Sequence, residues 1–511
     1  LAQTCALVQV LLATTASLDD DDDENNEKEE IKFIRAGDMK IAFLTIGDSA
    51  MTLLAVSYTG DETEAFLHMQ LEYVYAQILF TLTDQVQNIL ETNPNFDLRD
   101  LLGATDTVME GILDEISSIP TFITSGVETT CPIPIEIREN VSRILHAAGN
   151  QIPNIVYAIV TVGRKLVTMV QPKKNEHQIR GMDLHLILNF VDRQPGLLTS
   201  GDSWLPLCLP HLHPSSFVYA YTSCLNIDSG LTLVLVSTQS TSEQFLMFRT
   251  AGLIIKSSLG LEDDEDRKTI SDDDRKVIER FQETIGLSGF SGGSGGSSNG
   301  SSREGNKLRF LVGGGNANDY SRRGNNYQTS DLSSSQTPVT AKNPLVEAVI
   351  KAPSELCNKL DEYCKFASVF HFLFRRDIPI HSGNGSSSSS SCSRKLSHCI
   401  NSTFQIPLEN DAGSQRRVMN VYQRLALRLR YGSCKVEATM NAFDQFHANE
   451  ANSVAYDEYH YDNGRSTSAT NYFPAQGIFK EAPKIHGVTY MTDGYEMFMA
   501  LNGKNFELYA V

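Results

Sequence analysis

Hydrophobic and polar positions alternate along the middle of the chain in a way that predicts a mixed α/β segment. Residues 155–162 and 165–170 are β-branched runs on either side of Gly163 and Arg164, which is typical of a β-hairpin. The stretch 177–194 then places apolar residues at helical spacing, at Ile179, Met182, Leu186 and Phe190. A hairpin followed by a helix is the expected opening of this segment.

The same segment continues with three predicted strands and a closing helix. Pro, Asn, Asp and Gly residues separate the three apolar runs, which lie at 204–209, 217–225 and 231–237. The stretch 242–257 has the pattern of a helix, with Ser242 as its expected N-cap. The resulting order is β-β-α-β-β-β-α.

The first part of the chain shows this order without its opening hairpin. Residues 1–18 place Leu1, Cys5 and Val8 on one helical stripe and lack a basic start, so we expect an amphipathic helix rather than a signal peptide. Strands are then expected at 31–35, 41–45 and 52–58, and helices at 62–91, 98–116 and 135–148.

The last part repeats the order again, without its closing helix. Strands are expected at 366–374 and 399–407, followed by a helix at 414–431. Three more strands are expected at 487–491, 495–501 and 504–510. Asn502 and Gly503 lie between the last two and predict a two-residue hairpin turn.

Two changes in composition mark the boundaries between these parts. An acidic run occupies 19–30, and the stretch from about 286 to 341 contains the flexible tract SGGSGGSSNGSS. A polar insertion at 381–393 lies inside the last part. The boundaries predict domains at 1–150, 151–262 and 344–511, with an acidic and Gly/Ser-rich linker at 263–343.

Charge and cysteine content narrow the classes of function. The chain has 43 Lys and Arg against 62 Asp and Glu, a net charge of −19, which argues against a nucleic-acid-binding protein. Nine cysteines, an odd number in 511 residues, fit a reducing compartment better than a disulfide framework. The chain contains no uninterrupted apolar run of about 18 residues, so we predict no membrane-spanning helix. We therefore expect a cytoplasmic protein.

Motifs for catalysis or metal binding are weak. The sequence has no GxxxxGK[ST] phosphate loop, no HExxH and no GxSxG. The best metal candidate is the set Cys208, His211, His213 and Cys224. It lacks a second paired spacing, so two core cysteines and two turn histidines are the preferred interpretation. His185 and His371 lie among apolar residues and are expected in the core, and we expect no metal, no cofactor and no catalytic residue.

One predicted helix concentrates positive charge. The stretch 414–431 places its arginines on one face and apolar residues on another, and a basic amphipathic helix of this kind can lie on anionic lipid. A solvated surface helix is the alternative. The candidate contacts with an anionic membrane are Lys173, Lys174, Arg417, Arg424 and Arg428, and an acidic partner is the other ligand that such a helix could meet.

Several longer stretches resemble a known family. The first part contains IRAGDMKIAFL (34–44), QLEYVYAQILFTLT (70–83) and NPNFDLRDLLG (93–103). The middle adds DLHLILNFV (183–191) and GDSWLPLCLPHLHPSSFVYAYTSCL (201–225), and the last part adds SQRRVMNVYQRLALRLR and GYEMFMALNGKNFELY. Together they resemble the Mon/SAND family of vacuolar and endosomal fusion proteins, closely over about 31–260 and loosely over 345–511.

The resemblance implies an α+β fold of three longin domains, each a five-stranded antiparallel sheet flanked by helices. The first domain would lack its opening hairpin and the third its closing helix, so we expect a chain truncated at both ends. The implied function is that of a subunit in a heterodimeric guanine-nucleotide exchange factor for a Rab-seven-type GTPase. It would act in endosome maturation, autophagy and vacuole or lysosome fusion, without covalent chemistry.

The resemblance also implies partners. They are a longin-domain protein of the calcium–caffeine–zinc-sensitivity family, the Rab-seven-type GTPase, an upstream Rab-five-type GTPase and a third regulatory subunit. The complex would be recruited peripherally to the phosphoinositide-bearing membrane of endosomes, vacuoles or lysosomes.

The matching motifs imply a platform for the GTPase and the partner in the first domain. Its expected residues are Gly37, Asp38, Lys40, Glu72, Tyr73, Tyr75, Asn95, Asp97 and Arg99. Tyr73 shares the apolar face of its helix, so a core position is its alternative. For the whole chain the alternative is a non-catalytic longin adaptor that tethers or sorts vesicles. An enzyme with an unrecognised site is the third hypothesis.

Overall fold

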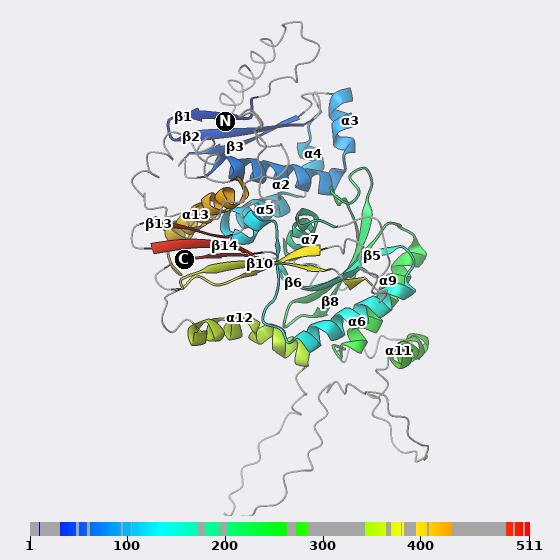
Figure 1. Cartoon of the computed structure of the whole chain (residues 1–511). Coiled ribbons are helices and arrows are strands. Elements are labelled where there is room, and N and C mark those ends of the chain that lie inside the picture. Colours follow the sequence, from blue (N-terminus) through cyan, green and yellow to red (C-terminus); the bar gives the residue numbers. More distant parts are fainter. Residues whose placement is uncertain are drawn as a thin grey trace, which may run out of the picture.

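A computed structural model of the chain contains three β-sheets with helices packed between and around them (Figure 1). It describes residues 10, 31–46, 51–58, 62–93, 96–103, 105–171, 179–193, 196, 202–262, 272–284, 343–363, 369–379, 381–382, 395–405, 408–431, 487–493, 496–503 and 506–511. The expected helix at 1–18, apart from Val10, the acidic run at 19–30 and the tract at 286–341 lie outside the described residues.

The second sheet is formed mainly by the middle of the chain. Its strand order is β11-β6-β5-β9-β8-β7, and all neighbours are antiparallel except β11, which is parallel to β6. The expected hairpin joins β5 to β6, with Val162 paired to Lys165. The strands are β5 (Ile155–Val162), β6 (Lys165–Gln171), β7 (Ser203–Leu207), β8 (Val218–Asn226), β9 (Leu231–Ser237) and β11 (His381–Ser382).

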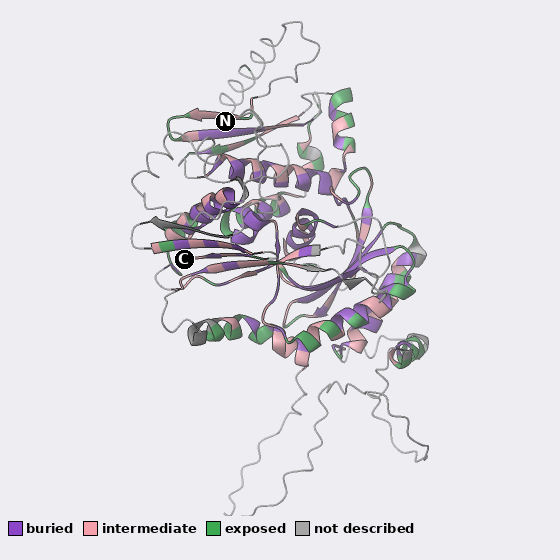
Figure 2. Cartoon of the chain, viewed as in Figure 1, coloured by how far each residue is buried: buried purple, intermediate pink, exposed green. Residues whose placement is uncertain are grey.

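Helices cover both faces of the second sheet, because successive residues of a strand point to opposite sides. Ile159 of β5 belongs to the apolar cluster that contains α7 (Gly181–Arg193). Its neighbour Val160 belongs to the cluster that contains α6 (Ile135–Gln151) and α9 (Ser242–Ser258). Strands β5 and β9, in the middle of this sheet, are correspondingly buried along nearly their whole length (Figure 2).

Helix α9 is capped by Thr241 and not by the expected Ser242. The hydroxyl of Thr241 accepts a hydrogen bond from the Gln244 backbone N–H at 3.2 Å. The Gln244 side-chain oxygen accepts one from the Thr241 backbone N–H at 3.4 Å. This reciprocal pair satisfies two backbone donors at the start of the helix, which a cap at Ser242 would leave unpaired.

The third sheet repeats the strand order of the second. When the strands of each sheet are numbered along the chain from its opening hairpin, both sheets place them side by side in the order second, first, fifth, fourth, third. Helix α13 (Ala412–Tyr431) packs on the third sheet. The expected repeat of antiparallel five-stranded units is thereby confirmed for these two sheets. The strands are β10 (Phe372–Pro379), β12 (Lys395–Asn401), β13 (Gly487–Asp493), β14 (Glu496–Gly503) and β15 (Phe506–Ala510).

The opening strands of the third sheet lie elsewhere than expected. The hydrophobic pattern put them at 366–374 and 399–407, whereas β10 runs on to Pro379 and β12 starts at Lys395, with which Pro379 pairs. The ends of β10 and β12 are set by the pairing register between them, which involves residues on both strands. The hydrophobic pattern of a single strand carries no information about this register.

The last hairpin turn is also shifted. Gly503 pairs with Phe506, so Gly503 and its neighbour Asn502 are strand residues of β14 rather than turn residues. Asn502 is buried and pairs with Glu507, which explains why it continues the strand.

The first sheet has three described strands in the order β1-β2-β3. Helix α2 (Glu64–Leu82) packs on one face, where Leu67 and Leu71 cluster with Ala42. The strands are β1 (Phe33–Ala36), β2 (Met39–Ile46) and β3 (Met51–Ser57). Three further helices follow α2, namely α3 (Gln85–Thr92), α4 (Arg99–Leu102) and α5 (Asp106–Ser118).

The single long helix expected at 62–91 is interrupted at Thr83. This residue adopts φ 63° and ψ −179°, a conformation that ends α2, and α3 starts two residues later. The break is fixed from another part of the chain, because the Asp84 N–H donates to the Pro214 carbonyl at 3.0 Å. The apolar spacing alone did not reveal this contact.

A connecting segment at residues 120–131, the strap, joins the second and third sheets. It contains the 3-10 helix η1 (Pro120–Thr124) and the short strand β4 (Val127–Glu128). Strand β4 pairs in parallel with β12, and Thr129 forms a bridge to Leu166 of β6. The two sheets therefore meet along the strap and lie side by side below the first sheet (Figure 1).

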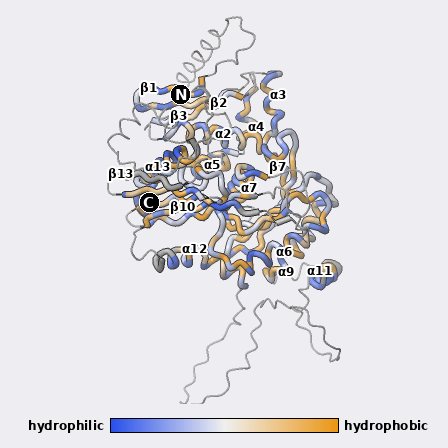
Figure 3. Tube along the Cα trace, in the orientation of Figure 1, coloured by the Kyte–Doolittle hydropathy of each residue, from blue (hydrophilic) through white to orange (hydrophobic). Residues whose placement is uncertain are grey.

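Two helices pack near the second sheet that the pattern did not predict. Helix α11 (Asp272–Thr284) falls in the stretch assigned to a linker, yet its Ile278 and Phe281 are buried in the cluster of α9. Helix α12 (Pro344–Tyr363) opens the stretch assigned to the third domain, but its Leu345 is buried in that same cluster. Strands β5 and β9 of the second sheet consist mostly of hydrophobic residues, which Figure 3 colours orange.

Candidate functional site

The expected platform residues lie in two groups at opposite ends of the first sheet. Gly37 and Asp38 form the exposed turn between β1 and β2. Gly37 has φ +63°, which favours glycine, and no atom lies within 4 Å of the position its Cβ would take. This turn is available for contact, and its glycine serves the backbone conformation.

Lys40, next to that turn, is buried. Only 2% of the residue is exposed, and its ammonium donates to the backbone carbonyl of Glu62 at 3.0 Å. The Glu62 carboxylate in turn accepts a hydrogen bond from the hydroxyl of Ser57. Lys40 thus anchors the chain just before α2 to the sheet, and its ammonium group is buried inside the platform domain.

Helix α2 carries three expected residues in different environments. Tyr73 is buried, as its alternative assignment to the core predicted, and its O–H donates to Nδ1 of His185 at 2.7 Å. Burial raises the pKa of Tyr73 well above its ordinary value. Tyr75 is half-buried and accepts a hydrogen bond from Gln87 of α3, and Glu72 is half-exposed.

Asp97 and Arg99 form a compact pair at the other end of the first sheet. The Arg99 guanidinium donates from Nε to Oδ1 at 2.9 Å, and the Arg99 backbone N–H donates to the same oxygen at 3.0 Å. These bonds lower the pKa of the Asp97 carboxyl to about 2. The Arg99 side chain is 90% exposed, so the pair presents a fixed charge to solvent, whereas Asn95 lies outside the described residues.

Three apolar side chains are exposed beside this pair. Ile89, Phe96 and Leu101 have exposed fractions of 36%, 36% and 41%, and we call them the α3–α4 patch. Their neighbours Leu90, Leu98 and Leu102 pack in one small cluster at the end of α2. The motif at 93–103 included two of the three residues, but nothing local distinguished their exposed side chains from the buried ones.

The two groups are separated by the length of α2. Lys40, beside the turn between β1 and β2, is hydrogen-bonded to the chain just before α2. Leu98 and Leu102 pack with Leu79, near the other end of α2. A helix rises about 1.5 Å per residue, so these points are roughly 25 Å apart. The structure therefore brings Tyr75, Asp97 and Arg99 together at one end and leaves Gly37 and Asp38 at the other.

The basic helix expected to contact lipid is enclosed by the fold. Helix α13 has buried residues around most of its surface, and the hydroxyl of Thr63, the N-cap of α2, contacts Gln423 on it at 3.3 Å. Arg417 pairs with Glu496 of β14 at 2.5 Å, and Arg424 and Arg428 are half-buried. The expected lipid contact by this helix is corrected, because its apolar face is already occupied by the sheet. Lys173 and Lys174 lie outside the described residues.

The metal candidate does not assemble. Cys208 is buried with its pKa raised to about 12 by desolvation, and its thiol donates to the Pro214 carbonyl at 3.4 Å. His211 approaches Asp183 instead, at 3.3 Å from Nδ1 to Oδ1. Among the residues that the structure describes, no group of three or more His, Cys, Asp or Glu side chains has the geometry to hold a metal ion.

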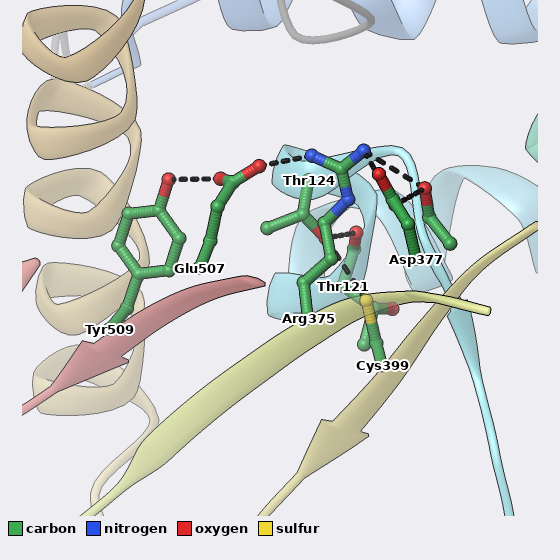
Figure 4. Close-up of polar contacts among 8 residues, drawn as sticks. Thr121, Thr124, Arg375, Asp377, Cys399, Glu507 and Tyr509 are labelled. Carbon is green, nitrogen blue, oxygen red and sulfur yellow. Dashed lines mark hydrogen bonds and ion pairs between the residues drawn. The ribbon is translucent and has the colours of Figure 1, made fainter. Parts of the chain in front are cut away.

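The third sheet carries a buried ionic cluster against the strap (Figure 4). Arg375 on β10 pairs with Glu507 on β15 and donates to Ser397 on β12 at 2.9 Å. Beside it, the Cys399 thiol lies 3.2 Å from the hydroxyl of Thr124 in η1, and its pKa is raised to about 12 by burial. The cluster connects β10, β12 and β15 with the strap, so its role is structural.

Two parts of the chain match families of longin domains. Residues 23–112 match the family described as "First Longin domain of FUZ, MON1 and HPS1", and residues 153–253 match "Second Longin domain of FUZ, MON1 and HPS1". The first match contains the α3–α4 patch and both groups of platform residues. No helix in the described ranges is long and apolar enough to cross a membrane.

Curated proteins give the same relationship. "Protein SAND" of Takifugu rubripes is 34% identical over 212 residues, which cover 41% of this chain and 39% of that protein. "Vacuolar fusion protein MON1 homolog A" of Gallus gallus is 32% identical over 212 residues, 41% of this chain and 37% of its own length. "Vacuolar fusion protein MON1" of Cryptococcus neoformans is 30% identical over 264 residues, 52% of this chain and 39% of its own length. The matched part thus spans about two fifths of each relative.

Proposed function

Because this chain belongs to the Mon/SAND family of longin-domain proteins, we propose that it is a subunit of a heterodimeric guanine-nucleotide exchange factor. Its GTPase is of the Rab-seven type, and its partner subunit is a longin protein of the calcium–caffeine–zinc-sensitivity family. An upstream Rab-five-type GTPase and a third regulatory subunit complete the proposed assembly. The vacuolar fusion named in its relatives is the process that it serves.

The observation that carries this proposal is the exposed end of the first longin domain. The α3–α4 patch, Tyr75 and the Asp97–Arg99 pair are gathered there on elements anchored to α2. Exposed apolar side chains next to a rigid charged pair are typical of a protein-binding surface. An exchange factor works through such a surface, because it acts by binding the GTPase and not by covalent chemistry.

The energy that the surface must supply is moderate. A ~10⁵-fold acceleration of GDP release corresponds to about 7 kcal/mol of differential binding between the resting GTPase and its transition state for release. Contacts that displace the switch segments, which hold Mg²⁺ and phosphate, supply energy of this size. The membrane attachment that we propose is peripheral, at endosomes, vacuoles or lysosomes.

GDP release tests the proposal. The full-length chain is co-expressed with its longin partner, and Rab-seven-type and Rab-five-type GTPases are loaded with fluorescent GDP. We expect strong acceleration for the Rab-seven type only, and only with both subunits present. If a verified, folded complex leaves GDP release at its intrinsic rate for both GTPases, the alternative of a non-catalytic vesicle adaptor is favoured instead.

Paired variants then locate the active end of the first domain. Asp38→Ala changes the turn end and Arg99→Ala changes the α3–α4 end, and both side chains are exposed. Asp228→Ala, in the exposed turn before β9, is the matched control. We expect Arg99→Ala to slow exchange while the control retains full activity. Loss of activity with Asp38→Ala alone would place the GTPase at the opposite end.

A further inference from the structure

The β7–β8 loop, residues 208–217, is hydrogen-bonded to the end of helix α2. The Cys208 backbone N–H donates to the Phe80 carbonyl at 2.9 Å, and the Asp84 N–H donates to the Pro214 carbonyl at 3.0 Å. In an uninterrupted α-helix, the Asp84 N–H would instead donate to the Phe80 carbonyl, four residues earlier. The loop therefore occupies both partners of one hydrogen bond that the helix would otherwise make to itself.

The chain between these two partners is held away from the helical conformation. Thr83 is buried and adopts φ 63° and ψ −179°, a strained region for any residue except glycine. The residues on either side keep helical spacing, which is why the hydrophobic pattern predicted one helix over 62–91. The local sequence thus favours a continuous helix, while the contact with the loop favours the break.

The β7–β8 loop is itself fixed on the second longin domain. The His211 N–H donates to Oδ1 of Asp183 at 3.1 Å, and this carboxylate is fully buried in the first turn of α7. The Cys208 thiol donates across the loop to the Pro214 carbonyl at 3.4 Å, which is also the acceptor of the Asp84 N–H. The second domain therefore sets the position of the two groups that bind α2.

We propose that α2 and α3 form a two-state element, and that docking of the β7–β8 loop selects its state. With the loop docked, the helix is broken at Thr83 and α3 turns away from the axis of α2, as in Figure 1. With the loop withdrawn, the Phe80 carbonyl and the Asp84 N–H pair with each other, and α2 continues into α3. The two states exclude each other, because the same two backbone groups take part in both.

This element couples the second longin domain to the α3–α4 patch. Val86 and Leu90 of α3 pack with Ile78 of α2 in the broken state, and this packing helps the loop to oppose the strain at Thr83. The exposed Ile89 lies on the same short helix, so closure of the break would move it relative to α2. Elements with two discrete arrangements are the usual carriers of conformational change between domains. The coupling does not depend on the exchange activity proposed above, because it involves only groups within the chain.

Hydrogen exchange of the full-length protein tests the proposal. The Asp84 N–H is hydrogen-bonded in both states, to Pro214 in one and to Phe80 in the other. The Cys208 N–H has its acceptor only while the loop is docked. A change of state therefore exposes the Cys208 amide and keeps the Asp84 amide protected. Separation of the loop without closure of the helix exposes both amides together.

Substitutions at Thr83 change the balance between the two states. Alanine favours a helix and is strained in the broken conformation, so Thr83→Ala should raise the exchange rate at Cys208 several-fold and leave the rate at Asp84 unchanged. Glycine adopts the broken conformation without strain, so Thr83→Gly should lower the rate at Cys208 below that of the wild type. Thr81→Ala is the matched control, because Thr81 is already helical, and it should leave the rate at Cys208 nearly unchanged.

The two variants at Thr83 make the outcome decisive. Opposite changes at Cys208 in Thr83→Ala and Thr83→Gly, with a constant rate at Asp84, would support the two-state element. Equal acceleration of both amides in Thr83→Ala would overturn it, because the helix then does not close. Melting curves check that each variant is folded. If Thr83→Ala does not fold, Thr83→Gly still decides, since a wild-type rate at Cys208 in this variant overturns the proposal and a lower rate supports it.

Discussion

The imidazole of His185 joins the strap to the first domain. Its Nε2 lies 2.9 Å from the carbonyl oxygen of Gly126 and its Nδ1 lies 2.7 Å from the hydroxyl of Tyr73. A carbonyl only accepts, so Nε2 carries the hydrogen and Nδ1 accepts from the tyrosine. One buried ring thereby links α2, α7 and the strap, and its position depends on the backbone of a single glycine.

Gly126→Ala is expected to destabilise the protein. Its Cβ would overlap the Sγ of Cys399, which is buried and hydrogen-bonded to Thr124. Overpacking of this kind costs about 1–3 kcal/mol, and here it also shifts the carbonyl that His185 uses. Thermal unfolding measures the effect, with Gly196→Ala as control because its Cβ would meet open space. Equal melting temperatures for the two variants would contradict the tight contact.

Acid is expected to unfold the protein between about pH 6.5 and 4. Burial lowers the pKa of His185, His371 and His398 to about 4, so each stays neutral in the fold while the unfolded chain binds its proton near pH 6.5. Stability is therefore full above pH 6.5 and falls as the pH drops toward 4. The slope reaches about 1.4 kcal/mol per pH unit for each histidine. Urea midpoints of the wild type and of His185→Gln across this range measure how much of the pH dependence of stability comes from His185.

Glu115 is expected to oppose that trend. Burial raises the pKa of its carboxyl to about 7, although Arg164 lies 3.0 Å away and favours the charged form. Its contribution to stability is full below pH 4.5 and is lost as the pH rises through 7. Glu115→Gln should therefore gain stability relative to the wild type between pH 5 and 7.5. A constant difference between their urea midpoints would show that Glu115 titrates normally.

At Thr83 we expect glycine to stabilise the protein more than alanine does. The backbone there, φ 63° and ψ −179°, is a region occupied almost only by glycine, and strain of this kind costs about 1–3 kcal/mol. Both substitutions remove the hydroxyl, so the difference between Thr83→Gly and Thr83→Ala isolates the backbone. At Asn93, where φ is −137°, the usual order with alanine at least as stable should return. Chemical denaturation of the four variants makes the comparison.

Removing Arg375 is expected to cost more than removing its whole ion pair. Glu507 is 3% exposed and also accepts from the Tyr509 hydroxyl at 2.9 Å, so Arg375→Met leaves a buried carboxylate without its cation. That loss is about 3–5 kcal/mol. The double variant Arg375→Met with Glu507→Leu should recover much of it. If the double variant melts lower than Arg375→Met alone, the carboxylate has a role beyond this pair.

Part of the candidate site was predictable, and part was not. The motif at 93–103 marked the end of the first domain that exposes Phe96, Leu101 and Arg99, because a motif is a local property of the chain. The burial of Lys40 was not predictable, since it depends on the carbonyl of Glu62, which lies on another element. A lysine in a polar-looking turn gives no local signal of such a partner.

The basic helix shows the same limit. Its amphipathic pattern correctly predicted a helix with one apolar face, and α13 does pack that face. The pattern cannot say whether lipid or protein covers the face, because both are equally apolar. The packing of Val418, Val421 and Leu425 against the third sheet decided this in favour of protein.

By itself, the sequence determined the five-stranded repeat of the second and third sheets and the hairpin that joins β5 to β6. These follow from side-chain periodicity and turn chemistry, which act over a few neighbouring residues. Only the tertiary structure decided the strap, the break at Thr83 and the division of the platform residues between two ends. Each of these depends on hydrogen bonds or packing between residues far apart in the chain, and such contacts exist only once the chain has folded.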